Sequence, residues 1–181
     1  MVFIFYPSIL YFITKIGYKN FFKAIFPAQM LAFSTSSSAA TLPLTMKRVK
    51  KNLNVSEEVT SFVCPLGATI NMDGTSIHQA ISAVFIAQAF GQDLTIADQL
   101  VIIVTATLSS IGAAAVPGAG LIMLVIVLEA VGIDPQGLAL IIAIDRPLDM
   151  CRTIVNVTGD ATVASIVAYS EGENVKFNED E

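Results

Sequence analysis

Apolar residues fill long stretches of this 181-residue chain, and polar residues gather at a few points between and within them. The stretches without formal charge are Met1–Thr14, Ala24–Met46, Val59–Met72, Gly74–Gln92 and Leu100–Leu128, with His78 taken as neutral. Runs of about 18 or more such residues are typical of membrane-embedded helices. Because they recur along the whole length, a signal peptide does not account for them. The pattern predicts an all-α membrane protein.

The segment from Asp145 to Asp160 is the exception, because it carries several charged side chains inside an apolar run. At about 100° per residue, a helix places five polar groups on one face roughly 80° wide. They are Asp145, Asp149, Arg152, Asn156 and Asp160. One interpretation is the solvated face of an ordinary amphipathic helix. The apolar character of the whole chain favours a buried polar face that lines a binding site.

The stretch Ala24–Met46 is interrupted by Ser34–Ser38 and by Pro43, and basic residues flank it on both sides. A helix crossing the bilayer would place one basic flank outside the cell, against the usual bias of Lys and Arg toward the cytoplasm. A re-entrant helical hairpin keeps both flanks inside. We therefore expect a hairpin over residues 24–46 with the serines at its tip. The alternative for the serines themselves is that they have no binding role and are small residues that allow the helices to pack closely.

The later stretches are also broken by residues that disfavour helix. Asn71–Thr75 interrupts a predicted span over residues 59–92. As one helix, Leu100–Leu128 would be about 43 Å long, which exceeds a hydrocarbon core of about 30 Å. Glycines and Pro117 lie in its middle, so we expect a second re-entrant hairpin over residues 96–131. A final span over 135–170 completes two re-entrant hairpins and two spans, one broken, in an inverted repeat.

These segments give a domain plan. Inverted repeats with broken helices are a design of secondary transporters, so residues 24–170 are expected to be a transport core. Residues 1–23 are expected to be the end of a transmembrane helix and a cytoplasmic linker, and residues 171–181 an acidic, disordered cytoplasmic tail. Outside the final span, all eight remaining Lys and Arg residues fall on one predicted side, as expected for a multi-pass protein of the cell (inner) membrane.

Composition adds two exclusions. Only 14% of residues are charged and 54% are hydrophobic, and no basic stripe with interleaved aromatics indicates nucleic-acid binding. The two cysteines, Cys64 and Cys151, have no metal-ligand spacing and imply no disulfide framework.

Four segments occur in a specific order: TSSSAATLP at 35–43, PLGATINMDGT at 65–75, SIGAAAVPGAG at 110–120 and LDMCRTIVNVTGD at 148–160. On these segments the chain resembles the C-terminal transport core of the sodium-coupled glutamate/aspartate symporters, the dicarboxylate/amino acid:cation symporter family. The resemblance implies alternating-access symport of an acidic amino acid with bound sodium ions and no organic cofactor. It also implies that the protein is embedded in a lipid bilayer and that the complete family protein forms a homotrimer. The chain is expected to be a fragment without the family's N-terminal scaffold helices.

By this resemblance, Arg152 binds the side-chain carboxylate of the substrate and Asp149 binds its ammonium group. An arginine suits this role because its guanidinium can hold a carboxylate with two hydrogen bonds. An internal Arg152–Asp149 ion pair is the alternative. The presence of both residues favours an acidic amino acid over a C4-dicarboxylate. The other implied substrate residues are Ser36, Ser38, Thr75, Val116, Pro117, Gly120, Thr153 and Asn156.

The resemblance also implies three sodium sites built from oxygen ligands. The first uses carbonyls of Gly67, Asn71 and Asn156 with the Asp160 carboxylate. The second uses carbonyls of Thr69, Ser110, Ile111 and Ala113. The third uses Asn71 and Asp73, and in the family it is completed by hydroxyls from a scaffold helix. Met72, between the ion and substrate positions, either couples them or is core packing.

Other functions remain as alternatives. They are a C4-dicarboxylate or neutral amino-acid symporter and a truncated membrane protein that does not transport. Gln79 stands where the animal glutamate carriers have a proton-carrying glutamate, which argues against their proton and potassium coupling. His78 is expected to be a packed or interfacial histidine rather than a proton relay. A serine hydrolase is disfavoured because no G-x-S-x-G elbow occurs, so we predict no enzyme activity.

Overall fold

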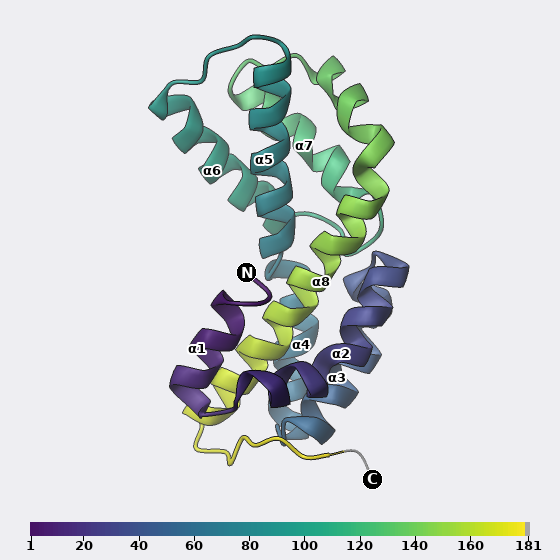
Figure 1. The fold of residues 1–181 in the computed structure, drawn as a ribbon, viewed down its shortest axis with the longest axis vertical. Coiled ribbons are helices and arrows are strands. Elements are labelled where there is room, and N and C mark those ends of the chain that lie inside the picture. The colour runs from purple at the N-terminus through teal and green to yellow at the C-terminus, as the bar shows by residue number, and fades with distance from the viewer. Residues whose placement is uncertain (180–181) are drawn as a thin grey trace.

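The computed structural model describes residues 1–179, and helices joined by turns make up most of that range (Figure 1). The described part contains no β-strand, so the predicted all-α class is confirmed. The elements are α1 (Phe5–Thr14), α2 (Tyr18–Thr35), α3 (Ser38–Asn52), α4 (Glu57–Ile70), α5 (Asp73–Ala89), α6 (Ile96–Ile111), α7 (Ala119–Ala130), the 3₁₀-helix η1 (Pro135–Gly137) and α8 (Leu138–Ser170).

The serine-rich segment is the turn between α2 and α3, which pack against each other. Ser36 adopts a left-handed conformation with φ 52°, and the Ser37 hydroxyl accepts a hydrogen bond from the Ala40 N–H as the N-cap of α3. Serine is favoured there because its side chain satisfies an N–H that has no partner within the helix. The expected interruption at Pro43 is wrong. Proline removes one N–H donor, and α3 continues past it.

These two helices are also longer than residues 24–46, because α2 begins at Tyr18 and α3 ends at Asn52. The nearest flanking basic residues, including Lys23 and Lys47, therefore lie within helices, whereas Lys15 lies between α1 and α2. Lysine and arginine have high intrinsic helix propensity, and two lysines in the last turn of α3 complement the negative end of its dipole.

The predicted broken span is two helices, α4 and α5, that meet at Asn71 and Met72. The break is shorter than the predicted Asn71–Thr75 because α5 already begins at Asp73. A carboxylate in the first turn is stabilised by the positive end of the helix dipole. Helix α6 begins one residue after its N-cap Thr95, which forms a capping box with Asp98.

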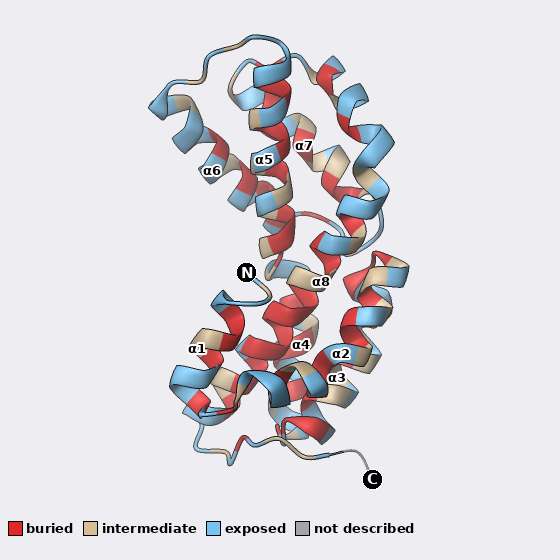
Figure 2. Cartoon of the chain, in the orientation of Figure 1, coloured by how far each residue is buried: buried red, intermediate tan, exposed pale blue. Residues whose placement is uncertain are grey.

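Helix α8 runs through the molecule and connects two groups of helices (Figure 1). Its C-terminal half packs with α1–α4 around a core that includes Phe21, Ile25 and Leu53. Its N-terminal half lies beside α5 and α7, whose core with α6 includes Ile86 and Leu124. Both groups contain buried residues, which Figure 2 colours red. The site described below lies where the two groups meet.

Many large apolar side chains face outward. Examples with more than 60% of their surface exposed are Ile96 (78%), Ile122 (74%), Phe62 (71%) and Leu108 (65%). Apolar surface of this extent is typical of proteins that contact a membrane or another protein. Within residues 1–179, no single helix combines the length and the hydropathy needed to cross a membrane.

The expected disorder of the C-terminal tail is wrong for residues 171–179. Lys176 and Asn178 donate backbone hydrogen bonds to the carbonyls of Leu53 and Asn52, at 3.2 and 2.9 Å. Val175 is buried among the helix ends, so this short segment has both apolar and hydrogen-bonding partners. Residues 180 and 181 of the predicted tail lie outside the described residues.

The tail also carries two acidic contacts. The Glu173 carboxylate accepts hydrogen bonds from the backbone N–H and hydroxyl of Ser56, the N-cap of α4, at 2.8 and 2.6 Å. Glu179 pairs with Lys23 at 2.6 Å, and this contact lowers the pKa of the Glu179 carboxyl. Acidic side chains at a helix N-terminus and beside a lysine are favourable, which accounts for the position of the tail.

Candidate functional site

The predicted polar face of α8 is buried rather than solvated, so the amphipathic-surface interpretation is wrong. Asp149, Asn156 and Asp160 are each 2% exposed, and Arg152 is 8% exposed. Asp145, at the outer end of the face, is half-buried. Helices α1, α4, α5 and α7 pack against α8 and cover this face.

Arg152 and Asp149 form an ion pair one turn apart on α8. The second carboxylate oxygen of Asp149 accepts a hydrogen bond from the Gly118 N–H at 2.9 Å, in the turn before α7. A side chain at Gly120 would collide with the Arg152 guanidinium, so glycine there lets the start of α7 approach the arginine. The observed ion pair is the alternative raised for these residues.

Asn156 connects α8 to the start of α5. Its side-chain carbonyl accepts a hydrogen bond from the Gly74 N–H at 2.8 Å, and its amide donates to Thr75 Oγ1 at 3.4 Å and Met72 Sδ at 3.2 Å. A Cβ at Gly74 would also collide with the backbone carbonyl of Arg152. The α4–α5 break thus brings backbone donors directly against α8.

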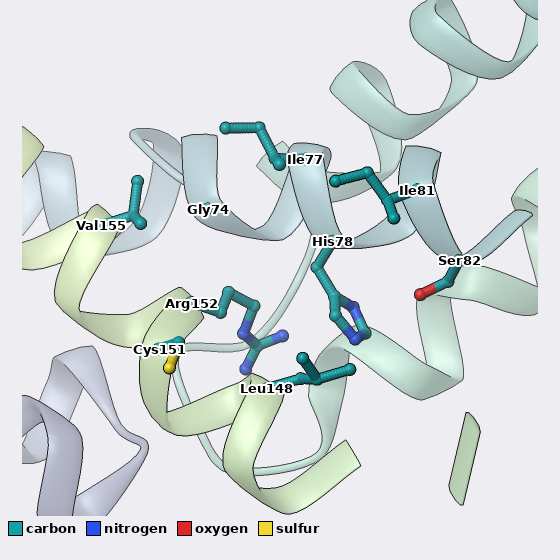
Figure 3. Close-up of a pocket in the computed structure, with 9 residues that line it drawn as sticks. All are labelled: Gly74, Ile77, His78, Ile81, Ser82, Leu148, Cys151, Arg152 and Val155. Carbon is teal, nitrogen blue, oxygen red and sulfur yellow. The ribbon is translucent and has the colours of Figure 1, made fainter. Parts of the chain in front are cut away.

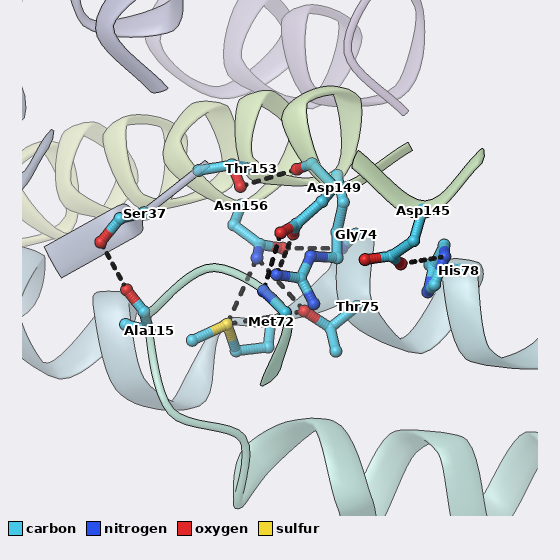
Figure 4. Close-up of polar contacts among 12 residues, drawn as sticks. Ser37, Met72, Gly74, Thr75, His78, Ala115, Asp145, Asp149, Thr153 and Asn156 are labelled. Carbon is cyan, nitrogen blue, oxygen red and sulfur yellow. Dashed lines mark hydrogen bonds and ion pairs between the residues drawn. The ribbon is translucent and has the colours of Figure 1, made fainter. Parts of the chain in front are cut away.

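The two helical tips meet beside this group. The Ser37 hydroxyl donates to the Ala115 carbonyl at 2.7 Å (Figure 4). The Ala39 N–H donates to the same carbonyl at 3.3 Å. Of the other predicted substrate residues, Thr153 is buried and donates to the Asp149 carbonyl at 2.9 Å. Ser36 and Ser38 are buried at one tip, whereas Val116 and Pro117 are exposed at the other.

Three residues predicted for the first sodium site lie together. The Asn71 amide donates to Asp160 Oδ1 at 3.0 Å. A Cβ at Gly67 would lie 2.5 Å from the same oxygen, so glycine is needed for α4 to approach the carboxylate. Within the described residues, no Lys, Arg or His forms an ion pair with Asp160. The donor set is oxygen-rich and anionic, which fits a hard cation such as sodium.

The residues predicted for the second and third sodium sites are not grouped as closely as those of the first. Asp73 is half-buried and accepts a hydrogen bond from the Tyr6 hydroxyl at 2.6 Å. Thr69 is exposed, and its hydroxyl donates to the Leu66 carbonyl. Across the described chain, no hydrogen bond joins Thr69 to the group Ser110, Ile111 and Ala113 at the end of α6. That second group stays a prediction.

A cavity of about 220 Å³ adjoins the site between α5 and α8 (Figure 3). Arg152 and His78 project into it beside apolar residues that include Leu148 and Ile81. His78 is packed, as expected, with an 8% exposed side chain and its Nε2 atom 3.7 Å from Asp145 Oδ1. All the lining residues come from α5 and α8, and none belongs to the two helical tips.

Several residues of the site were missed by the sequence interpretation. Ser37 and Gly118 lie inside the motifs that were singled out, but their neighbours were chosen instead. Ser76 contacts Ser110 at 2.7 Å between hydroxyl oxygens. Tyr6 lies in an apolar stretch 67 positions before its partner Asp73, and no local sequence pattern connects the two.

Broken helices and helical tips that converge on buried, oppositely charged side chains are the architecture of a secondary transporter. A family model described as the sodium:dicarboxylate symporter family matches residues 1–170. The chain belongs to this family, whose members are transporters and not enzymes.

Named relatives agree with this assignment. The chain is 46% identical over 163 residues to human "Excitatory amino acid transporter 5", a match that covers 90% of this chain and 29% of that protein. It is 47% identical over 163 residues to a Caenorhabditis elegans "Excitatory amino acid transporter", covering 90% and 32%. For human "Excitatory amino acid transporter 2" the identity is 45% over 166 residues, covering 92% and 29%. The chain spans about a third of the length of these relatives.

Proposed function

We propose that this chain is the substrate- and ion-binding core of a membrane symporter that carries an acidic amino acid together with sodium. The names of its relatives refer to excitatory amino acids, and the family description refers to sodium. The observation that carries the proposal is the buried Arg152–Asp149 pair, which lies between the two helical tips and the α4–α5 break.

The charge pattern of this pair matches an acidic amino acid. A buried ion pair is costly unless both charges remain compensated. A substrate with a side-chain carboxylate and an ammonium group can separate Arg152 from Asp149 and give each a new opposite charge. A C4-dicarboxylate has no cation to offer Asp149, so it would leave this carboxylate uncompensated. The α-carboxylate of the substrate would then accept hydrogen bonds from the Asn156 amide and from backbone N–H groups at the helix starts.

Sodium would be held by Asp160 with Asn71 and neighbouring carbonyls, where it supplies the positive charge that the buried carboxylate lacks. Asn156 is on the face of α8 between Asp160 and Arg152, so the ion and substrate groups share one helix. Ion and substrate binding would favour each other through this helix, since binding free energies are coupled reciprocally.

The membrane arrangement belongs to the same proposal. The α2–α3 and α6–α7 pairs enter from opposite ends of the molecule and meet at their tips, which supports two re-entrant hairpins in an inverted repeat (Figure 1). Exposed apolar side chains over the outer surface support a lipid environment. Alternating access would move this core relative to other helices of the complete protein, with a homotrimer as the expected assembly.

The direct test is uptake of labelled aspartate into liposomes that contain the complete protein. We expect uptake driven by an inward sodium gradient, competition by unlabelled aspartate and weak competition by succinate. Replacing sodium with choline should abolish it. Well-folded protein that takes up no aspartate in sodium would refute acidic amino-acid symport. Equal competition by succinate would instead favour the dicarboxylate alternative.

A further inference from the structure

Tyr6 lies in the first half of helix α1, and the structure connects it to the ion site. Its side chain is 4% exposed, and its hydroxyl donates a hydrogen bond to Asp73 Oδ2 at 2.6 Å. No hydroxyl from this chain was expected at Asp73. A short hydrogen bond to a carboxylate is charge-assisted and therefore among the stronger ones.

The backbone around Tyr6 is arranged to allow this contact. A Cβ added at Gly159 of α8 would lie 2.8 Å from the Tyr6 hydroxyl oxygen and 2.6 Å from Asn71 Nδ2. The missing side chain at Gly159 thus lets α1 and the α4–α5 break meet on the same face of α8. Tyr6 and Asp73 are joined there beside Asn71, which in turn donates to Asp160.

The group has anionic oxygens but no cation. Within residues 1–179, neither Asp73 nor Asp160 forms an ion pair with a basic side chain. Their hydrogen-bond donors are the neutral Tyr6 hydroxyl and Asn71 amide. Asp160 is buried and Asp73 is half-buried, and a bound cation would compensate the charge of both carboxylates.

We propose that Tyr6 is a positioning residue of the ion site, whose hydroxyl fixes the Asp73 carboxylate in the orientation that binds sodium. The inference rests on the proposed sodium-coupled function. A free aspartate at the first position of a helix samples several rotamers, and ordering it when the ion arrives would weaken binding. A buried phenol on a separate helix orders it beforehand.

The test is the thermal unfolding temperature of the complete purified protein, measured without substrate across a sodium titration. Hydrogen-bond partners of metal ligands are commonly worth about 10–100-fold in metal affinity. We expect Tyr6→Phe to raise the sodium concentration for half-maximal stabilisation about tenfold. The matched control is Tyr18→Phe, which also removes a tyrosine hydroxyl bonded to α1, through Ser8 at 2.5 Å, but on the exposed side. It should leave the sodium dependence unchanged.

A second background separates positioning from packing. In protein that carries Asp73→Asn, the remaining sodium response comes from the Asp160 site, and adding Tyr6→Phe should not shift it further. The inference is overturned if Tyr6→Phe lowers the unfolding temperature equally at every sodium concentration, or if it shifts the titration equally in both backgrounds. A wild-type protein without any sodium response would overturn the proposed sodium coupling as well.

Discussion

At the scale of single residues, the site is a set of buried charges that compensate one another incompletely. Arg152 and Asp149 neutralise each other, whereas within residues 1–179 the side chain that donates to the Asp160 carboxylate is the neutral Asn71 amide. Buried charges are costly, so a residue of this kind is expected to have a ligand or partner. The two predictions at this scale remove one charge each from the proposed substrate and ion positions.

Arg152→Cys should weaken aspartate binding by about two orders of magnitude, because the substrate carboxylate loses charged hydrogen bonds. The variant could then accept neutral amino acids. Aspartate and alanine affinities of the complete protein measure this change. Arg146→Cys is the control, since Arg146 is exposed on the same helix and should change affinity little. Normal aspartate uptake by Arg152→Cys would show that another cation holds the substrate.

Asp160→Asn keeps the size of the side chain but removes the charge that offsets a buried cation. We expect aspartate binding to require about tenfold more sodium, with partial recovery at saturating sodium, because ion and substrate binding are coupled. The measurement is aspartate affinity across a sodium titration, with Asp145→Asn as the same-helix control. If Asp145→Asn abolished the sodium dependence and Asp160→Asn did not, the ion would bind at the other end of the polar face.

At the scale of elements, close helix contacts at glycine position the polar groups. Gly67, Gly74 and Gly120 each lie where a Cβ would meet a functional group of α8. Without these approaches, the α4–α5 break and the start of α7 would stand farther from Asp160 and Arg152. The breaks in the helices supply the free N–H groups, and the glycines bring them within hydrogen-bonding distance.

Gly74→Ala should therefore destabilise the protein, although alanine normally favours helix. The added Cβ meets the Arg152 backbone carbonyl, which cannot rotate away, so we expect a loss of about 1–3 kcal/mol from overpacking. Thermal or denaturant unfolding measures it. The matched control is Gly112→Ala at the end of α6, where φ is −88° and the nearest atoms lie 3.7 Å away. Equal stability of the two variants would contradict the close α5–α8 approach.

At the scale of the whole molecule, α8 joins two helix groups whose hairpin tips touch at its centre. This arrangement places the site midway along the long axis, distant from both ends (Figure 1). A site in the middle of a membrane can be opened to either side by moving the surrounding helices. The remaining prediction concerns how the ends are oriented.

Cysteines at Lys19 and Lys50 should both react with an impermeant reagent from the cytoplasmic side, and a cysteine at Gln92 from outside. Lys19 and Lys50 are exposed at the ends of α2 and α3. The background should lack Cys151, which is exposed, and Cys64. Labelling of positions 19 and 50 from opposite sides would rule out the α2–α3 re-entrant hairpin and make residues 24–46 one ordinary crossing.

Local pattern alone was enough for several features of this protein. The sequence predicted the charge-free stretches, the serine-rich turn, the Asn71 break and the polar face of α8. These features were predictable because helix periodicity and helix-breaking residues act locally. The composition of the whole chain also predicted that the polar face would be buried. The tail was misread for the opposite reason. Its composition is polar, yet Val175 and backbone hydrogen bonds anchor it to distant helix ends.

Only the tertiary structure determined which polar groups meet. The Ser37–Ala115, Gly118–Asp149 and Tyr6–Asp73 contacts join residues 78, 31 and 67 positions apart. Such contacts depend on how whole helices pack, and packing is decided by side-chain volumes and glycine approaches summed over several elements. The sequence therefore identified the charged face and the helix breaks, while the packing of α1, α5 and α7 on α8 decided how they form one site.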